Sequence, residues 1–353
     1  MATETAEQAL AEWLRFQSEA CGHLGSELYA VLLRQAAEDV EAHGPTWDVL
    51  RGHEVDSPAS ALVLRLMGAV NRLVLAGKEP MLARIYDGPD VDPAVAWNAF
   101  SAVLERNREE LRRSIHLPVQ TNEVGRCAAL LFGFLAVAEE TGLPLRLFEI
   151  GASAGLNLRW DRYRYEAGGF AWGPVGSDVR IEFDLEGEVP DLPASVEIAG
   201  RHGCDPAPID PSSPEGRLTV LAYIWPDQKF RLERMRAALR LVDEVPIELD
   251  HEAAASWTKR MLAQSTPGTA TVVYHSLVMQ YLSDGELAEF HRQIEQAGGR
   301  ATADAPLAWL RMEPAGDHTD LLLTAWPGGE ESHLARAGYH GTPVELLPSP
   351  SHR

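Results

Sequence analysis

Apolar side chains recur at helical spacing through the first 142 residues of the chain. This periodicity predicts several helices and no strand before Leu145. We therefore expect a helical N-terminal cap region over residues 1–142. The clearest set on one helix face is Leu62, Leu66, Val70 and Leu73.

From residue 143 onward, short apolar runs alternate with helical segments. Ser283 followed by Glu286 predicts a capping box at the start of one of these helices. Such alternation predicts an α/β fold with a Rossmann-like, mostly parallel sheet over residues 143–353 and an insertion around 166–194. Runs of strand length cover residues 145–150, 179–185, 195–199, 245–250, 271–276, 307–312, 320–326 and 344–347.

One segment, from Leu145 to Leu158, organises the rest of the pattern. Its apolar run is followed by a turn of glycines and small residues, and then by a run from Leu156 to Tyr163 that is compatible with a helix. Strand, glycine turn and helix in this order are typical of a nucleotide-binding corner. Glycines allow a tight turn and the close approach of a ligand, while the start of the helix offers N–H groups.

Three interpretations fit this corner. Read as E-x-G-x-x-x-G over Glu149, Gly151 and Gly155, it is the first motif of a Rossmann-like S-adenosylmethionine (SAM) site. Read as G-x-S-x-G, it is a nucleophile elbow that exposes Ser153 for acyl transfer. The third interpretation is a tight turn without a ligand.

Polar residues at the ends of the later strands favour the first interpretation. Asp250 and His275 lie at the ends of predicted strands, as Glu149 does, and Asp205 closes the segment that follows the predicted strand over residues 195–199. Ligands of open α/β sheets bind outside the carboxyl ends of the strands. An acid at the second strand end can accept both ribose hydroxyls, and another at the third can face an adenine amino group.

The nucleophile elbow is less favoured because almost everything upstream of Ser153 is helical. An acid and a histidine in the required order, such as Asp250 with His275 or His318, are expected by chance in this chain. Metal sites are not predicted either. The segment beginning at His251 lacks the second histidine of a zinc protease helix, and the residues around Cys204 lack a partner pair.

The net charge of −21 disfavours nucleic acids and membranes as partners unless a local basic patch exists. Such an acidic surface repels nucleic-acid backbones and anionic membranes. The nearest approach to a basic patch lies in a predicted helix over residues 231–242, where we expect the arginines to form its solvated face. These arginines are Arg231, Arg234, Arg236 and Arg240.

The three cysteines indicate the compartment. Cys21, Cys127 and Cys204 are scattered and odd in number, so we expect no disulfide framework and a cytoplasmic location. The acidic N-terminus is not that of a signal peptide. The longest apolar run, 127–138, is shorter than the ~20 residues of a membrane span.

Two further groups are candidates for the acceptor side of a site. The polar loop before residue 127 either caps a helix through Thr121 or Asn122 or lines a ligand pocket. Aromatic residues later in the chain either form a wall for an acceptor or belong to the core. The loop candidates are Gln120, Asn122, Glu123 and Arg126, and the aromatic candidates are Tyr223, Trp225 and Tyr281.

The corner and several other motifs resemble an uncharacterised bacterial family of unknown function (DUF2332). The resemblance covers residues from about Trp13 to about Pro327, and the family itself resembles Rossmann-like SAM-dependent methyltransferases. Ser153 stands where those enzymes usually have a middle glycine. The shared segments are EIGASAGLN at 149–157, WDRY at 160–163, QTNE at 120–123, GCD at 203–205, PID at 208–210, WPDQ at 225–228, HS at 275–276 and YL at 281–282.

This second resemblance implies roles for individual residues. It assigns Asp205 to the ribose, Asp250 to the adenine and His275 to the methyl-transfer face. If the acceptor must lose a proton, His275 is the candidate base. In the alternative interpretation, His275 is a hydrogen-bonded structural residue that closes a buried strand. The remaining cofactor candidates, at the methionine end and in the turn beside it, are Glu149, Gly151, Ala152, Ser153, Gly155 and Asn157.

We therefore expect a SAM-dependent methyltransferase-like enzyme that acts on a small molecule, with His275 and Tyr281 as the candidate catalytic residues. A non-catalytic SAM- or nucleotide-binding partner or regulator is the first alternative. A serine hydrolase that uses Ser153 is the second.

Overall fold

The computed structural model describes residues 6–54, 56, 60–88, 92–117 and 119–348. The chain forms two units, and each is assembled from two separate segments. Residues 1–121 and 213–233 make a helical unit, whereas residues 122–212 and 234–353 make a unit built on a large sheet. The division therefore falls elsewhere than at the expected boundary of residue 142, and segment 213–233 belongs with the N-terminal helices.

The helical unit owes its core to the periodic apolar positions of its helices. Leu66 and Val70 are fully buried, as the helical spacing predicts, and they pack in one cluster with Leu33 and Phe100. The helices are α1 (Ala6–His23), α2 (Glu27–Glu41), α3 (Pro45–Leu50), α4 (Leu62–Leu75), α5 (Pro80–Asp87), α6 (Pro93–Arg106), α7 (Arg108–Ser114) and α9 (Pro214–Ala222).

The later segment of this unit is fastened to the N-terminal helices by polar side chains. Asn71 donates hydrogen bonds to the carbonyls of Ala222 and Ile224, both at 3.0 Å. Asp227 accepts from the hydroxyl of Ser26, which caps α2, at 2.8 and 2.9 Å. Trp225 is buried in the same core. Of the two possibilities for this residue, a wall for the acceptor or a place in the core, the structure shows the second.

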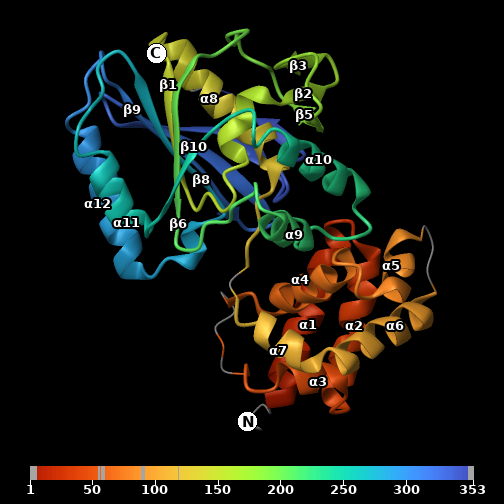
Figure 1. The fold of residues 1–353 in the computed structure, drawn as a ribbon. Coiled ribbons are helices and arrows are strands. Elements are labelled where there is room, and N and C mark those ends of the chain that lie inside the picture. Colours follow the sequence, from red (N-terminus) through yellow and green to blue (C-terminus); the bar gives the residue numbers. More distant parts are fainter. Residues whose placement is uncertain (1–5, 55, 57–59, 89–91, 118, 349–353) are drawn as a thin grey trace. The chain divides into compact units, whose positions relative to one another are not determined.

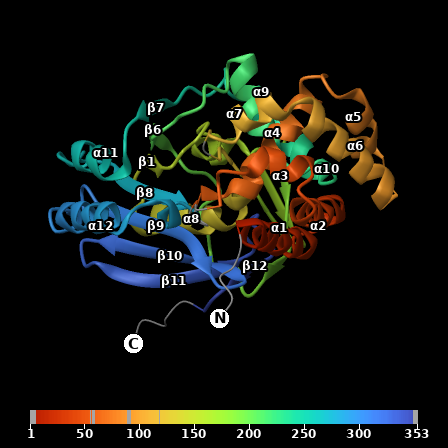
Figure 2. The same cartoon turned by 90° about the horizontal axis from the view of Figure 1, so that it is seen from below.

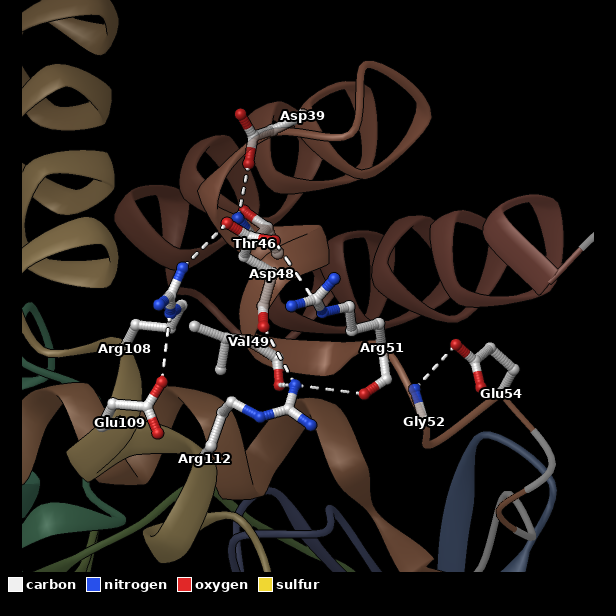
Figure 3. A network of polar contacts seen from close by, with 10 residues as sticks. All are labelled: Asp39, Thr46, Asp48, Val49, Arg51, Gly52, Glu54, Arg108, Glu109 and Arg112. Carbon is white, nitrogen blue, oxygen red and sulfur yellow. Dashed lines mark hydrogen bonds and ion pairs between the residues drawn. The ribbon is translucent and has the colours of Figure 1, made fainter.

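The side chain of Arg112 binds carbonyl groups at the C-terminal end of the short helix α3 (Figure 3). One nitrogen of Arg112 donates to the carbonyls of Asp48, Val49 and Arg51 at 2.9, 3.2 and 3.1 Å. The carbonyl groups in the last turn of a helix have no hydrogen-bond donor within the helix, so they need donors from elsewhere. Arg112, on α7, therefore ties two elements of the unit together.

The second unit contains a nine-stranded, mostly parallel sheet, which confirms the predicted α/β class. Figure 1 shows α11 (Ala254–Met261) and α12 (Asp284–Gly298) on one side of this sheet and α8 (Cys127–Thr141) on the other. In spatial order the strands are β7 (Glu248–His251), β6 (Ile198–Asp205), β1 (Leu145–Ile150), β8 (Ala270–Ser276), β9 (Leu307–Ala315), β10 (His318–Trp326), β11 (Glu330–Ala337), β12 (Val344–Leu346) and β5 (Leu185–Glu186).

The five strands from β7 to β9 run parallel, and the chain reverses its direction of winding within them. From β1 it moves outward through β6 to β7, and it then returns to β8 on the other side of β1. The gap between β1 and β8 is thus a topological switch point. The antiparallel strands β10 and β11 extend the sheet beyond β9, as Figure 2 shows.

The expected insertion forms a small sheet of its own. Its strands are β2 (Arg164–Ala167), β3 (Phe170–Trp172) and β4 (Arg180–Glu182). The single strand expected over residues 179–185 is split, because β4 pairs with β2 whereas β5 joins the large sheet beside β12.

Helix α10 (Lys229–Arg240) corrects the expectation of a solvated arginine face in part, because Arg236 and Arg240 are exposed as expected but Arg231 and Arg234 are buried. Arg231 and Arg234 are only 4% and 8% exposed. Arg234 forms an ion pair with buried Glu123 at 3.1 Å, and the guanidinium of Arg231 lies over the ring of Trp225.

Among the described residues, no helix is both long and apolar enough to cross a membrane.

Candidate functional site

The turn between β1 and the 3₁₀ turn η3 (Asn157–Arg162) lies at the carboxyl end of β1. Its backbone alternates through positive φ angles, with +67° at Gly151, +51° at Ser153 and +65° at Gly155. A serine in this region is strained, and such strain persists only where the surroundings hold it. The helix expected after the turn is a 3₁₀ turn instead.

The two glycines are required because other parts of the protein approach them closely. A Cβ atom on Gly151 would lie 2.6 Å from a methyl carbon of Val278, in the turn after β8. A Cβ atom on Gly155 would lie 2.1 Å from the Cδ1 of Ile247, just before β7. The glycines thus let neighbouring strand ends pack against the turn, in addition to allowing its positive φ angles.

Asp205, the last residue of β6, joins the ends of two strands. Its Oδ2 accepts from the amide of Ser153 at 3.0 Å, and its Oδ1 accepts from the amide of Ala207 at 2.8 Å. The hydrogen bond from Ala207 caps the local turn, as expected if Asp205 has a structural role. The hydrogen bond from Ser153 holds the glycine turn. A carboxylate with two such bonds retains lone pairs for further donors.

Two side chains that surround the turn hold it from other directions. Asn122 accepts from the amide of Leu156 at 2.9 Å. Arg159 donates from Nη1 to the carbonyl of Gly155 at 2.9 Å and from Nε to that of Val245 at 3.0 Å. Arg159 was not predicted, because the local pattern does not reveal that it joins the carbonyl of nearby Gly155 to that of Val245, which is 86 residues away.

Glu149 is buried beneath the same turn, with 3% of its surface exposed. Burial raises the pKa of its carboxyl group to about 8, although the nearby polar side chains of Tyr274 and Asn157 partly oppose this effect. Its Oε2 atom is buried and accepts no hydrogen bond from the described residues. Glu149 therefore lies in an environment that disfavours its charge.

The surroundings of Glu149 come from several elements. Asn157, at the start of η3, accepts a weak hydrogen bond from the thiol of Cys127 at 3.4 Å. Burial raises the pKa of the Cys127 thiol and of the Tyr274 phenol. The three cysteines are free thiols, as expected from the absence of a disulfide framework, and all three are buried.

His275, near the end of β8, has both ring nitrogens engaged. Its Nδ1 lies 2.6 Å from an oxygen of Glu313, and its Nε2 accepts from the indole N–H of Trp309 at 3.0 Å. The indole is only a donor, so Nδ1 carries the proton and donates to Glu313. This fully buried histidine matches the alternative of a hydrogen-bonded residue that closes a strand.

The polar loop before α8 reaches the same edge of the sheet. Arg126 donates to the carbonyl of Ser276, the last residue of β8, at 3.0 Å. Glu123, rather than Thr121 or Asn122, caps the following turn, because its carboxylate accepts from the amide of Gly125 at 2.8 Å. The structure thus brings Asn122 and Arg126 to the ends of β1 and β8.

Other candidates lie apart from this cluster or are engaged elsewhere. Asp250 accepts from the indole of Trp257 at 2.7 Å and from Arg260 at 2.8 Å, and the Arg260 hydrogen bond is the main cause of its lowered pKa. Tyr281, in the 3₁₀ turn η4 (Met279–Tyr281), is 52% exposed. Gln120 and Tyr223 belong to the helical unit.

The acid–histidine pairs of the hydrolase interpretation are not formed. Asp250 pairs with Arg260, His275 bonds to Glu313, and His318 lies 2.9 Å from Asp317. The backbone of Ser153 is engaged on both sides, by Asp205 and by the amide of Ile209. Within the described part of the chain, no cluster of three or more His, Cys, Asp or Glu residues could hold a metal ion.

Comparison with known proteins identifies a family but no activity. A family model described as uncharacterised proteins conserved in bacteria (DUF2332) matches residues 11–346, which confirms the resemblance expected from the motifs. No curated protein matches the chain. No solved structure matches it either.

Proposed function

We propose a function for this chain, which belongs to the bacterial family DUF2332 of uncharacterised proteins. The chain binds SAM at the carboxyl edge formed by β6, β1 and β8, and it promotes transfer of the methyl group to a small-molecule acceptor. The main support is that the glycine turn lies at the topological switch point of the parallel strands, with an acid at the end of the next strand.

The residues at this edge suit the chemical groups of the cofactor. The buried Oε2 of Glu149 calls for a donor, and an ammonium group would both satisfy it and favour its ionised form. Asp205 uses one lone pair on each oxygen within the protein, so its remaining lone pairs can accept two ribose hydroxyls. Glu149 would hold the methionine end and Asp205 the ribose.

When bound, SAM supplies an electrophilic methyl group. The contribution of the chain is therefore mainly to hold the donor and the acceptor in line and to exclude water. Asn122 and Arg126 lie at the ends of β1 and β8, and we assign them to the acceptor side of this edge. His275 would hold the end of β8 in place through Glu313 and Trp309 rather than accept a proton.

The test is a calorimetric titration of the purified protein with SAM and with its demethylated product, S-adenosylhomocysteine. Asp205→Asn is compared with Asp191→Asn, a control at an exposed site of the same unit. Loss of a charge-assisted bond, at roughly 1.5–3 kcal/mol, should weaken SAM binding about ten- to a hundredfold in Asp205→Asn alone. If the native protein binds neither compound at millimolar concentration, the proposal is wrong.

The engaged nitrogens of His275 favour a second candidate, a non-catalytic SAM-binding protein. In that case the titration would show binding, but incubation with methyl-labelled SAM and small-molecule extracts would yield no labelled product. Turnover with any acceptor would exclude this candidate.

A further inference from the structure

The turn after β8 faces the glycine turn across the switch point and contains a strained residue. Leu277 has a φ of +58°, a conformation that is uncommon for a leucine. Val278, the next residue, packs where a side chain on Gly151 would otherwise lie. The position of this turn therefore sets the space beside the glycine turn.

A carboxylate on the neighbouring strand β9 adds side-chain hydrogen bonds to the strained turn, where the amide of Leu277 also donates to the backbone carbonyl of Met312 on β9 at 2.9 Å. The Oε1 atom of Glu313 accepts from the Nδ1 of His275 at 2.6 Å, from the amide of Val278 at 3.0 Å and, more weakly, from the amide of Met279 at 3.5 Å. These donors flank Leu277 on both sides. Hydrogen bonds to a charged acceptor are about twice as strong as those between neutral groups.

The bond to His275 is itself fixed by a second partner. Trp309, also on β9, donates to Nε2 and so holds the proton of His275 on Nδ1, where Glu313 accepts it. Arg126, in the loop before α8, donates to the carbonyl of Ser276. The turn is thus held by Arg126 and by β9, and the side-chain hydrogen bonds from β9 converge on one oxygen atom of Glu313.

We propose that Glu313 is a positioning residue for the ligand site. Glu313 holds residues 276–281 at the distance from the glycine turn that ligand binding requires. This inference rests on the proposed function for the identity of the ligand. Glu313 acts through the turn and does not contact the ligand itself.

The test combines two measurements on the full-length protein. Hydrogen–deuterium exchange reports the tether without any ligand, and calorimetric titration with SAM reports the site. Glu313→Ala removes the acceptor, Glu313→Gln keeps one neutral acceptor oxygen, and Glu330→Gln is a control at an exposed position of the same sheet. Trp309→Phe removes the indole donor to His275 and leaves Glu313 in place.

We expect exchange in segment 276–281 to rise about tenfold in Glu313→Ala, while peptides of β10 and β11 stay unchanged. SAM affinity should fall about tenfold in Glu313→Ala and less in Glu313→Gln and Trp309→Phe. Partial rescue by Glu313→Gln is the sign of a lost acceptor rather than of general unfolding, which would raise exchange in β10 and β11 as well.

The outcomes separate this inference from the proposed function. Unchanged exchange at 276–281 in Glu313→Ala would overturn the tether. Raised exchange with unchanged SAM affinity would overturn the role in ligand positioning. If the native protein itself fails to bind SAM, the proposed function and the ligand role fall together, and the exchange measurement alone still decides whether Glu313 holds the turn.

Discussion

Replacement of Glu149 by glutamine should make the protein more stable at neutral pH. Glutamine has nearly the same shape as glutamate but carries no charge that burial can disfavour. In the folded protein the carboxyl group of Glu149 has a pKa of about 8, above the ordinary value of 4.5. The folded state therefore binds a proton more tightly here than the unfolded state does.

The size of the effect follows from this difference in pKa. Between about pH 4.5 and 8 the unfolded state is ionised at this site while the folded state holds its proton, so stability falls as the pH rises. At ~1.4 kcal/mol per pKa unit, the cost is about 3 kcal/mol at pH 7 and reaches about 5 kcal/mol above pH 8. Below pH 4.5 both states are protonated and the cost disappears.

Urea unfolding between pH 5 and 9, followed by tryptophan fluorescence, measures this dependence. Glu149→Gln should gain little stability at pH 5 and most at pH 9, whereas Glu139→Gln, at an exposed position of α8, should match the native protein throughout. If Glu149→Gln is no more stable than the native protein at pH 9, the carboxylate has partners that compensate for its burial. Under the proposed function, the same variant should also bind SAM more weakly, because it lacks the charge that would meet an ammonium group.

Two further predictions concern the serine and the short helix. Ser153→Ala should leave SAM binding within about twofold, and fluorophosphonate probes should not label the native protein; stoichiometric labelling at Ser153 would restore the hydrolase interpretation. Arg112→Ala should lower the free energy of unfolding by ~1–3 kcal/mol, because three carbonyls, two of them in part-buried contacts, lose their donor, whereas exposed Arg113→Ala should have little effect in the same urea titration.

The core of the sheet could be predicted from local patterns. Strand β1 has the predicted bounds, β8 begins one residue earlier than expected, and the capping box at Ser283 is present. Strand β11 was missed because its sequence, EESHLARA, is too polar to suggest a strand. Its pairing with β10 and β12 outweighs its own preferences.

The contacts that build the site are less visible in the sequence. The partners of Asp205 and His275 come from other strands, so the pattern identified these residues but not what they bind. Arg234 looked solvated because helical spacing alone does not reveal that Glu123 will lie beside it. The division of the chain into interleaved units likewise depends on contacts such as that of Asn71 with Ala222.

This interleaving bears on how the protein folds during synthesis. Domains usually fold in order as they leave the ribosome, beginning at the N-terminus. Here residues 1–121 emerge first, but their unit needs Trp225 for its core and Asp227 for the hydroxyl of Ser26. The helical unit cannot be completed until about residue 233 has emerged, by which time β1 and β6 have already emerged. The nascent chain must therefore hold an unfinished helical unit while the first parallel strands of the sheet are synthesised.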